Sequence, residues 1–189
     1  MDLCHEHYIN PSKPRHRPLF SSSATNPPAI SSIFARLISS VAFTLVQLVS
    51  QSHSERGYKL ILKKQVNSSL TSSSIPKISV SDYLYRICRY TKMEEDTLIL
   101  ALIYIDRFCK KQNVLLTDFN VHRILFASIV IAIKYIEDKF YSNKYYCKIG
   151  GMDLDVLNKI EMKFLVGIGF DLYVEEKFFH MYKNKLTKL

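Results

Sequence analysis

The stretch between Ile124 and Ile136 is the feature that most restricts what this chain can fold into. It is apolar except at Ser128, Lys134 and Tyr135, so apolar side chains would fall on every side of a helix. A helix that is apolar all round is stable only when other helices surround it. The sequence therefore predicts an all-α fold in which this segment is the central, buried helix.

Segments on both sides of the central helix have the apolar spacing of further helices. Ser79 and Asp82 stand at the spacing of a capping box, which predicts a helix start. Thr117 or Asn120 is expected to cap the central helix. The pair Gly150-Gly151 is expected to end a short helix, because glycine permits the positive φ of a helix C-terminus. The expected helices cover residues 80–90, 94–111, the central segment up to 136, 143–149, 153–168 and 175–186, with no strand-like alternation.

The N-terminal third is expected to differ from the rest. Residues 1–29 contain five of the six prolines and are predicted to be a disordered tail, because they cannot bury enough apolar surface to offset the entropy of ordering. Residues 30–50 have the pattern of an amphipathic helix, and Arg36 and Gln47 favour packing on the main domain over crossing a membrane. The predicted organisation is a tail (1–29), a helix with a Ser-rich linker (30–75), a main domain (76–172) and a C-terminal helix (173–189).

Charge and cysteine content further limit the kind of protein that this chain can be. The formal net charge of +9 includes no dense basic run with interleaved aromatic residues, so a solvated basic surface is favoured over nucleic-acid binding. The four cysteines form no C-x-x-C pair, and the polar start of the chain is not typical of a secretory signal. We expect reduced thiols and an intracellular protein, in the nucleus, the cytoplasm or both.

No catalytic motif is apparent. The chain has no phosphate-binding glycine loop, no H-E-x-x-H and no nucleophile elbow. Cys4, His5 and His7 could ligate a metal, but a structural zinc site takes four ligands at regular spacing and no second pair follows. We therefore expect a binding module rather than an enzyme, with no metal, no cofactor and no small-molecule substrate.

Two charged residues interrupt apolar stripes. Lys134 lies near the end of the central helix, and Glu161 lies between Leu157 and Leu165 on the inward side of a later helix. A partly buried charge is costly unless it is paired and hydrogen-bonded. Three interpretations are open: each side chain reaches water at the edge of its helix, the two pair with each other, or both face the backbone of a partner.

Several motifs, taken in order, resemble the cyclin box. The YIDRF motif at Tyr104–Phe108 closes the second expected helix, and Ala132–Glu137 ends the third. Ile160–Leu172 resembles the fifth helix and its exit, at a spacing that the family shares. The match covers residues 76–172 and implies a five-helix cyclin box around a central helix, with an extra N-terminal helix and a C-terminal helix. Further segments resemble the P/U-type cyclins, which are tied to phosphate signalling: Asn120–Arg123, Tyr145-Tyr146, Gly150-Gly151 and Leu157-Asn158.

The resemblance implies a function in the cell cycle or in phosphate signalling, as a non-catalytic subunit that binds and activates a cyclin-dependent protein kinase. Lys134 and Glu161 match the family's lysine and glutamate that hydrogen-bond the kinase near its mobile αC helix. Holding that helix inward would complete the kinase's own Lys–Glu ion pair. Asp106 matches a buried aspartate that pins two helices together, in an expected ion pair with Lys77.

The sequence also departs from the cell-cycle cyclins. Pro76–Val80 stands where those proteins carry a basic-aliphatic run that docks substrates, so that route of recruitment is not expected. Lys77 replaces the arginine that pairs with the aspartate, so Arg86, or no residue, remains an alternative partner for Asp106. The rival functions are a cyclin-fold adaptor for nucleic acid or transcription proteins, and a scaffold that binds a kinase without activating it.

Overall fold

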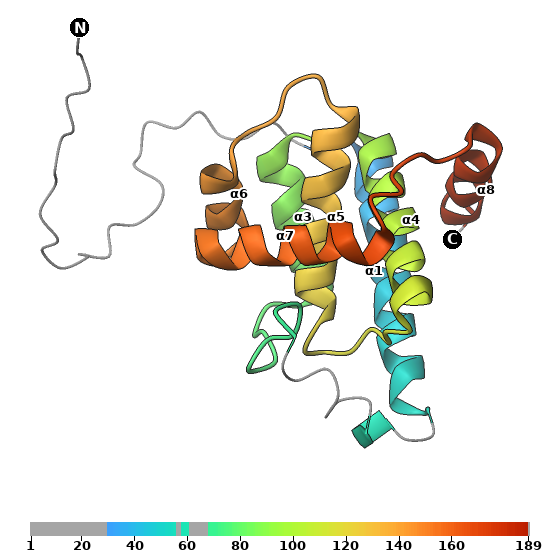
Figure 1. Cartoon of the computed structure of the whole chain (residues 1–189). Coiled ribbons are helices and arrows are strands. Elements are labelled where there is room, and N and C mark those ends of the chain that lie inside the picture. Colours follow the sequence, from blue (N-terminus) through green and yellow to red (C-terminus); the bar gives the residue numbers. More distant parts are fainter. Residues whose placement is uncertain (1–29, 56–57, 61–67, 189) are drawn as a thin grey trace, which may run out of the picture.

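The computed structural model describes residues 30–55, 58–60 and 68–188, and these ranges are helical with no strand. This confirms the predicted all-α class. The predictions for residues 1–29, including the Cys4, His5 and His7 cluster, lie outside the described residues. The helices are α1 (Ser32–His53), α3 (Val80–Thr91), α4 (Glu95–Gln112), α5 (Val121–Ile136), α6 (Asn143–Gly150), α7 (Leu154–Ile168) and α8 (Glu176–Leu186) (Figure 1).

Helix α5 is the centre of the domain, as its apolar sequence predicts. Its side chains from Ile124 to Ile133 are all buried. It packs against α4 and α3, and α7 crosses it (Figure 1). Helix α5 is enclosed along most of its length, and apart from Arg123 in its first turn it reaches the surface only from Lys134 onward.

Helix α1 packs its apolar face on α3 and α4, which confirms the expectation that residues 30–50 form a helix on the main domain. Ile38, Val41 and Leu45 are almost fully buried, whereas Phe43 on the outer side is 56% exposed. By length and composition α1 could also span a membrane, but the core helix of a soluble protein passes the same test. In this structure its apolar face belongs to the core.

The predicted capping chemistry is present at the start of α3 and at the end of α6. The hydroxyl of Ser79 accepts a hydrogen bond from the N–H of Asp82 at 3.0 Å and donates to its carboxylate at 2.7 Å. Asn120 stands before α5, but its side chain makes no capping hydrogen bond to that helix, because its oxygen accepts from the N–H of Thr117 at 2.8 Å instead. Gly151 ends α6 at φ +66°, a value that favours glycine.

Two other glycines serve close packing rather than a turn. Gly150 is still helical, and a Cβ atom there would overlap the ring of Phe126. Gly167 faces Phe108 in the same way, and the Phe108 ring stacks on Phe164 with ring centroids 4.6 Å apart. Helices α4 and α7 can therefore approach closely at this point.

The Ser-rich stretch expected to be a linker is attached to α5 in its described part. The guanidinium of Arg123 donates to the carbonyls of Ser69 at 2.7 Å and Thr71 at 3.0 Å. Leu70 between them is buried. Earlier in this stretch residues 58–60 are helical, and residues 61–67 lie outside the described residues.

Candidate functional site

Lys134 and Glu161 meet at the end of α5. Lys134 lies in the last turn of α5 and Glu161 in the middle of α7, which crosses α5. The ammonium nitrogen and the carboxylate oxygen are 2.5 Å apart, and the side chains are only 28% and 13% exposed. The internal pair was one of three interpretations of the sequence, and it is the one that the structure shows.

Asn143, at the first residue of α6, is a third member of this site that the sequence did not predict. Its side-chain nitrogen donates to the other carboxylate oxygen of Glu161 at 2.6 Å and to Asn158 at 2.8 Å. Its own side-chain oxygen is buried and has no hydrogen-bond partner in the described part of the chain. An unpartnered buried acceptor is unusual in folded proteins, and it adds an unused polar group next to the ion pair.

Large apolar side chains are exposed on the elements that carry this site. They are Tyr135 and Ile136 at the end of α5, Phe140 in the following loop, Met162 on α7, and Phe170 and Tyr173 after α7. Single exposed apolar residues need no explanation, but several on elements that meet at one half-buried ion pair indicate a protein-binding surface.

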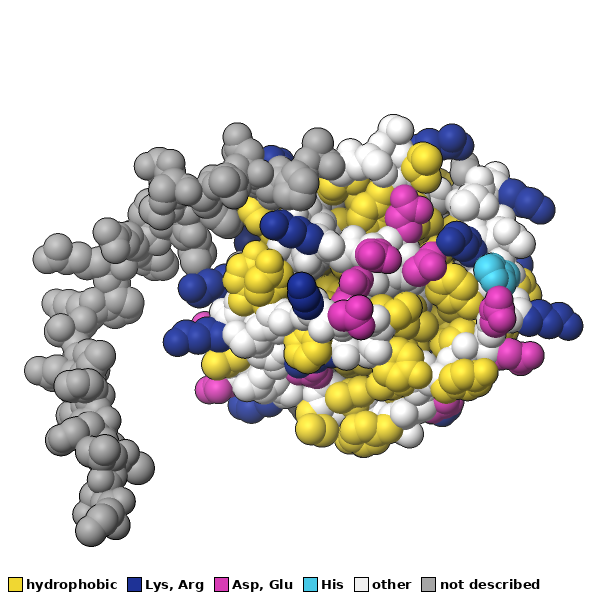
Figure 2. All heavy atoms as spheres, turned by 90° about the horizontal axis from the view of Figure 1, so that it is seen from above, with side chains coloured by type: hydrophobic (Ala, Val, Ile, Leu, Met, Phe, Trp, Pro, Cys, Tyr) yellow, Lys and Arg dark blue, Asp and Glu magenta, His cyan; other side chains and the backbone are white. Residues whose placement is uncertain are grey.

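The end of the molecule where α4 begins is acidic. Glu95 and Asp96 lie in the first turn of α4, where negative charge suits the helix dipole. Glu137, just after α5, accepts from the N–H of Glu94 at 3.1 Å and from the hydroxyl of Thr97. Figure 2 shows acidic side chains gathered among apolar ones on this face of the molecule. A basic partner surface would complement it.

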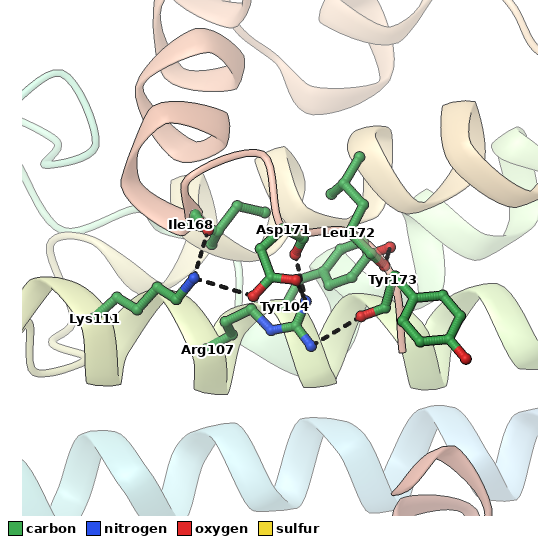
Figure 3. A network of polar contacts seen from close by, with 7 residues as sticks. All are labelled: Tyr104, Arg107, Lys111, Ile168, Asp171, Leu172 and Tyr173. Carbon is green, nitrogen blue, oxygen red and sulfur yellow. Dashed lines mark hydrogen bonds and ion pairs between the residues drawn. The ribbon is translucent and has the colours of Figure 1, made fainter. Parts of the chain in front are cut away.

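Residues 169–173, which we call the exit segment, leave α7 through a turn at Gly169-Phe170 and then run along α4 (Figure 3). Three side chains of α4, the α4 donors Tyr104, Arg107 and Lys111, donate hydrogen bonds to carbonyls of this segment or of the last residue of α7. Tyr104 donates to the carbonyl of Leu172 at 2.7 Å. Arg107 donates to the carbonyls of Asp171 and Tyr173, the latter at 3.1 Å. Lys111 donates to the carbonyl of Ile168, at the end of α7, at 2.9 Å.

Asp171 adds two ion pairs to this network. Its carboxylate oxygens lie 3.1 Å from Arg107 and 3.1 Å from Lys111. The hydrogen bond from Lys111, with the positive charges of Arg107 and Lys111, holds the pKa of Asp171 below its usual range. Burial raises the pKa of Tyr104, so its hydroxyl remains a protonated donor at neutral pH.

The predicted ion pair between Asp106 and Lys77 is wrong. Asp106 pairs with Lys110, one helical turn further on, at 2.7 Å, and accepts from the hydroxyl of Tyr182 on α8 at 2.7 Å. Lys77 makes no ion pair with it in the described part of the chain. Arg86, the alternative, donates to the carbonyl of Lys148 instead. Asp106 therefore joins α4 to the C-terminal helix rather than to α3.

The remaining titratable groups offer little chemistry. Among the described residues no three His, Cys, Asp or Glu side chains gather as a metal site, and Cys88, Cys109 and Cys147 are free thiols. Burial raises the pKa of Cys109 to about 12, so its reactive thiolate is scarce at neutral pH. His122 is buried, and its ring nitrogen lies 3.0 Å from the carbonyl of Ile78, which is a structural contact.

A buried central helix, a half-buried ion pair at its end and exposed apolar side chains on the elements that carry the pair define a helical protein-binding domain. The cyclin family model matches residues 15–172 of the chain. Cyclin-U4-1 of Arabidopsis thaliana is 34% identical over 164 residues, covering 86% of this chain and 78% of that protein. The chain belongs to the cyclin family, among its P- and U-type members.

Other relatives are matched over less of their length. Cyclin-U4-3 of Arabidopsis thaliana is 40% identical over 139 residues, which are 73% of this chain and 61% of that protein. Cyclin-P4-1 of Oryza sativa subsp. japonica is 41% identical over 108 residues, which are 57% of this chain and 51% of that protein. The chain thus spans between about half and about four fifths of these relatives. The family match begins at residue 15 and so includes α1.

Proposed function

We propose that this cyclin binds and activates a cyclin-dependent protein kinase through the surface centred on Lys134 and Glu161. The observation that carries the proposal is the half-buried pair itself, set on elements that also expose large apolar side chains. A pair that only stabilised the fold would not require such side chains on the elements around it.

The chemistry of the pair suits recognition of a backbone. The ammonium group of Lys134 has three donors and uses one on Glu161, and the Glu161 carboxylate has acceptor positions beyond those taken by Lys134 and Asn143. A partner's carbonyl could accept from Lys134 while its N–H donates to Glu161. Because each charge already holds the other in place, little side-chain entropy would be lost on binding.

Activation would follow from preferential binding to one kinase conformation. A cyclin that packs on the kinase's αC helix only in its inward position shifts the population toward that position. The inward helix completes the kinase's Lys–Glu ion pair, and ATP, magnesium and the phosphoryl-transfer chemistry belong to the kinase. This chain would supply differential binding energy and no catalytic group, in the nucleus, the cytoplasm or both. Substrates in phosphate signalling or the cell cycle are part of the same proposal.

The test is the affinity of the purified chain for cyclin-dependent kinases from its native cells, measured by calorimetry together with kinase activity. The variant Lys134→Ala with Glu161→Ala is expected to weaken binding by ~2–5 kcal/mol, because truncating charges buried in an interface typically costs that much. Kinase activation should fall with binding. The matched control is Glu176→Ala with His180→Ala, which removes an exposed contact of 3.5 Å within α8 and should change affinity little.

Equal binding by the wild type and the Lys134/Glu161 variant would contradict the assignment of the site. Recovery of nucleic acid or transcription proteins in place of any kinase would favour the adaptor function. Binding without a rise in kinase activity would identify a scaffold.

A further inference from the structure

We propose that Arg107 and Lys111 are positioning residues, which fix the exit segment in the conformation that presents Phe170 and Tyr173 to the kinase. The inference rests on the proposed function, because it concerns how the kinase-binding surface is built. The two side chains would act through the exit segment, without touching the partner themselves.

The first step is the direction of the hydrogen bonds. The α4 donors lie at positions 104, 107 and 111, a spacing that places them along one side of the helix. Between them they serve the carbonyls of Ile168, Asp171, Leu172 and Tyr173. Figure 3 shows the side chains of Arg107 and Lys111 extended toward the exit segment, one on each side of Asp171. The backbone of this segment is thus held by side chains of another helix.

The second step is that burial alone does not explain this arrangement. Leu172 packs partly buried against the core. Phe170 is 58% exposed and Tyr173 is 71% exposed, although they are the two largest apolar side chains of the segment. Because the hydrophobic effect does not favour these exposed positions, the polar contacts with α4 contribute to holding the segment in this conformation.

The third step is the backbone of Phe170, which has φ +54°. A bulky residue rarely adopts this left-handed conformation, and such strain persists only where the surroundings impose it. The N–H of Phe170 bonds to the carbonyl of Leu165 at 2.9 Å, and from there the α4 donors direct the chain. In this conformation the Phe170 side chain is 58% exposed and so is available to a partner.

The fourth step is the connection to the ion pair. Glu161, which pairs with Lys134, lies on α7, and the exit segment is the continuation of that helix. Tyr104, which holds the carbonyl of Leu172, lies on α4, and α4 packs against α5. One partner could therefore contact both the pair and the exit segment.

The experiment compares Arg107→Met and Lys111→Met with Lys183→Met as the matched control. Lys183 also makes an exposed ion pair, with Asp96, but lies on α8. The readouts are kinase affinity by calorimetry and amide hydrogen exchange of residues 169–175. We expect Arg107→Met to weaken kinase binding at least tenfold and to speed exchange in the segment. Lys111→Met should act in the same direction by about threefold, and the control should stay within twofold.

Lys111→Arg, which keeps the charge and the donor, should restore affinity to within twofold of wild type and so separate positioning from general destabilisation. If Arg107→Met fails to fold, by circular dichroism, the Lys111 series decides alone. Wild-type affinity in both methionine variants would overturn the inference while leaving the proposed function intact. Absence of kinase binding by the wild type would overturn both.

Discussion

Two lysine–carboxylate pairs in this protein differ in what they stabilise. Lys134 and Glu161 are 2.5 Å apart and 28% and 13% exposed, and their polar contacts are with side chains. Lys111 and Asp171 are 3.1 Å apart and 44% and 47% exposed, and Lys111 also donates to a backbone carbonyl. The first pair joins two helices of the core, whereas the second holds the course of a surface segment.

The difference shows why counting ion pairs says little about their role. An exposed pair is screened by water and contributes ~0–1 kcal/mol to stability. Its value can lie in the backbone geometry that it imposes, which a stability measurement does not record. A half-buried pair contributes to stability chiefly by preventing an unpaired charge.

The largest effect should come from removing one partner of the Lys134–Glu161 pair, which we call the inner pair. Glu161→Ala leaves Lys134 half-buried without its partner and Asn143 without its acceptor, so we expect the free energy of unfolding to fall by about 3 kcal/mol, the lower end for a buried pair because Lys134 can still reach water. Asp171→Ala should lower it far less, because its ion pairs are exposed and screened by water. Urea unfolding of both variants measures the contrast, and similar losses in the two would refute it.

An intermediate effect is expected from Phe170→Gly, with Phe170→Ala as its comparison. Glycine relieves the left-handed strain and alanine keeps it, so the glycine variant should unfold with a free energy about 1 kcal/mol higher than the alanine variant. Both should bind the kinase about tenfold more weakly than wild type, because both lack the exposed ring; a buried apolar side chain contributes ~1.5–3 kcal/mol. Phe43→Ala on α1, a ring of similar exposure, should bind normally.

If the glycine variant bound the kinase like wild type, the ring would not be a contact. If the glycine variant were less stable than the alanine variant, the left-handed backbone at Phe170 would not destabilise the folded protein.

The smallest effect is the titration of Asp171. The pKa of Asp171 in the folded protein is held below the ordinary value of about 3.9. The Lys111–Asp171 pair is therefore intact at neutral pH and is lost only as the pH falls through that lowered pKa. Carboxyl chemical shifts in a pH series should place the midpoint below 3.9 in the wild type, and Lys111→Met should move it upward. An unchanged midpoint would mean that Lys111 does not reach the carboxylate in solution.

Much of the fold could be predicted because it depends on apolar periodicity. The run from Ile124 to Ile133 can be stable only inside a bundle, and Ser79 with Asp82 marks a helix start through local chemistry alone. The inner pair could be predicted as one of three options, since Lys134 and Glu161 both interrupt apolar stripes.

The rest of the site depends on contacts that leave little trace in a sequence. Asn143 starts a short helix and reaches Glu161 only because α6 packs on α7. Arg107 and Lys111 bond to carbonyls, which every residue carries, so no motif marks their acceptors. Asp106 was assigned to Lys77 by resemblance, but Lys110 lies one turn away on the same helix and Tyr182 comes from α8, a helix outside the motif.

Gly167 is buried and allows α4 and α7 to approach each other closely. Any side chain at that position would push against Phe108 and widen the space between α4 and α7. The side chains of Arg107 and Lys111 already extend toward the exit segment (Figure 3), so a wider spacing would lengthen and weaken their hydrogen bonds to it. The affinity of this cyclin for its partner could therefore be tuned, in evolution or by design, from a residue that no partner ever touches.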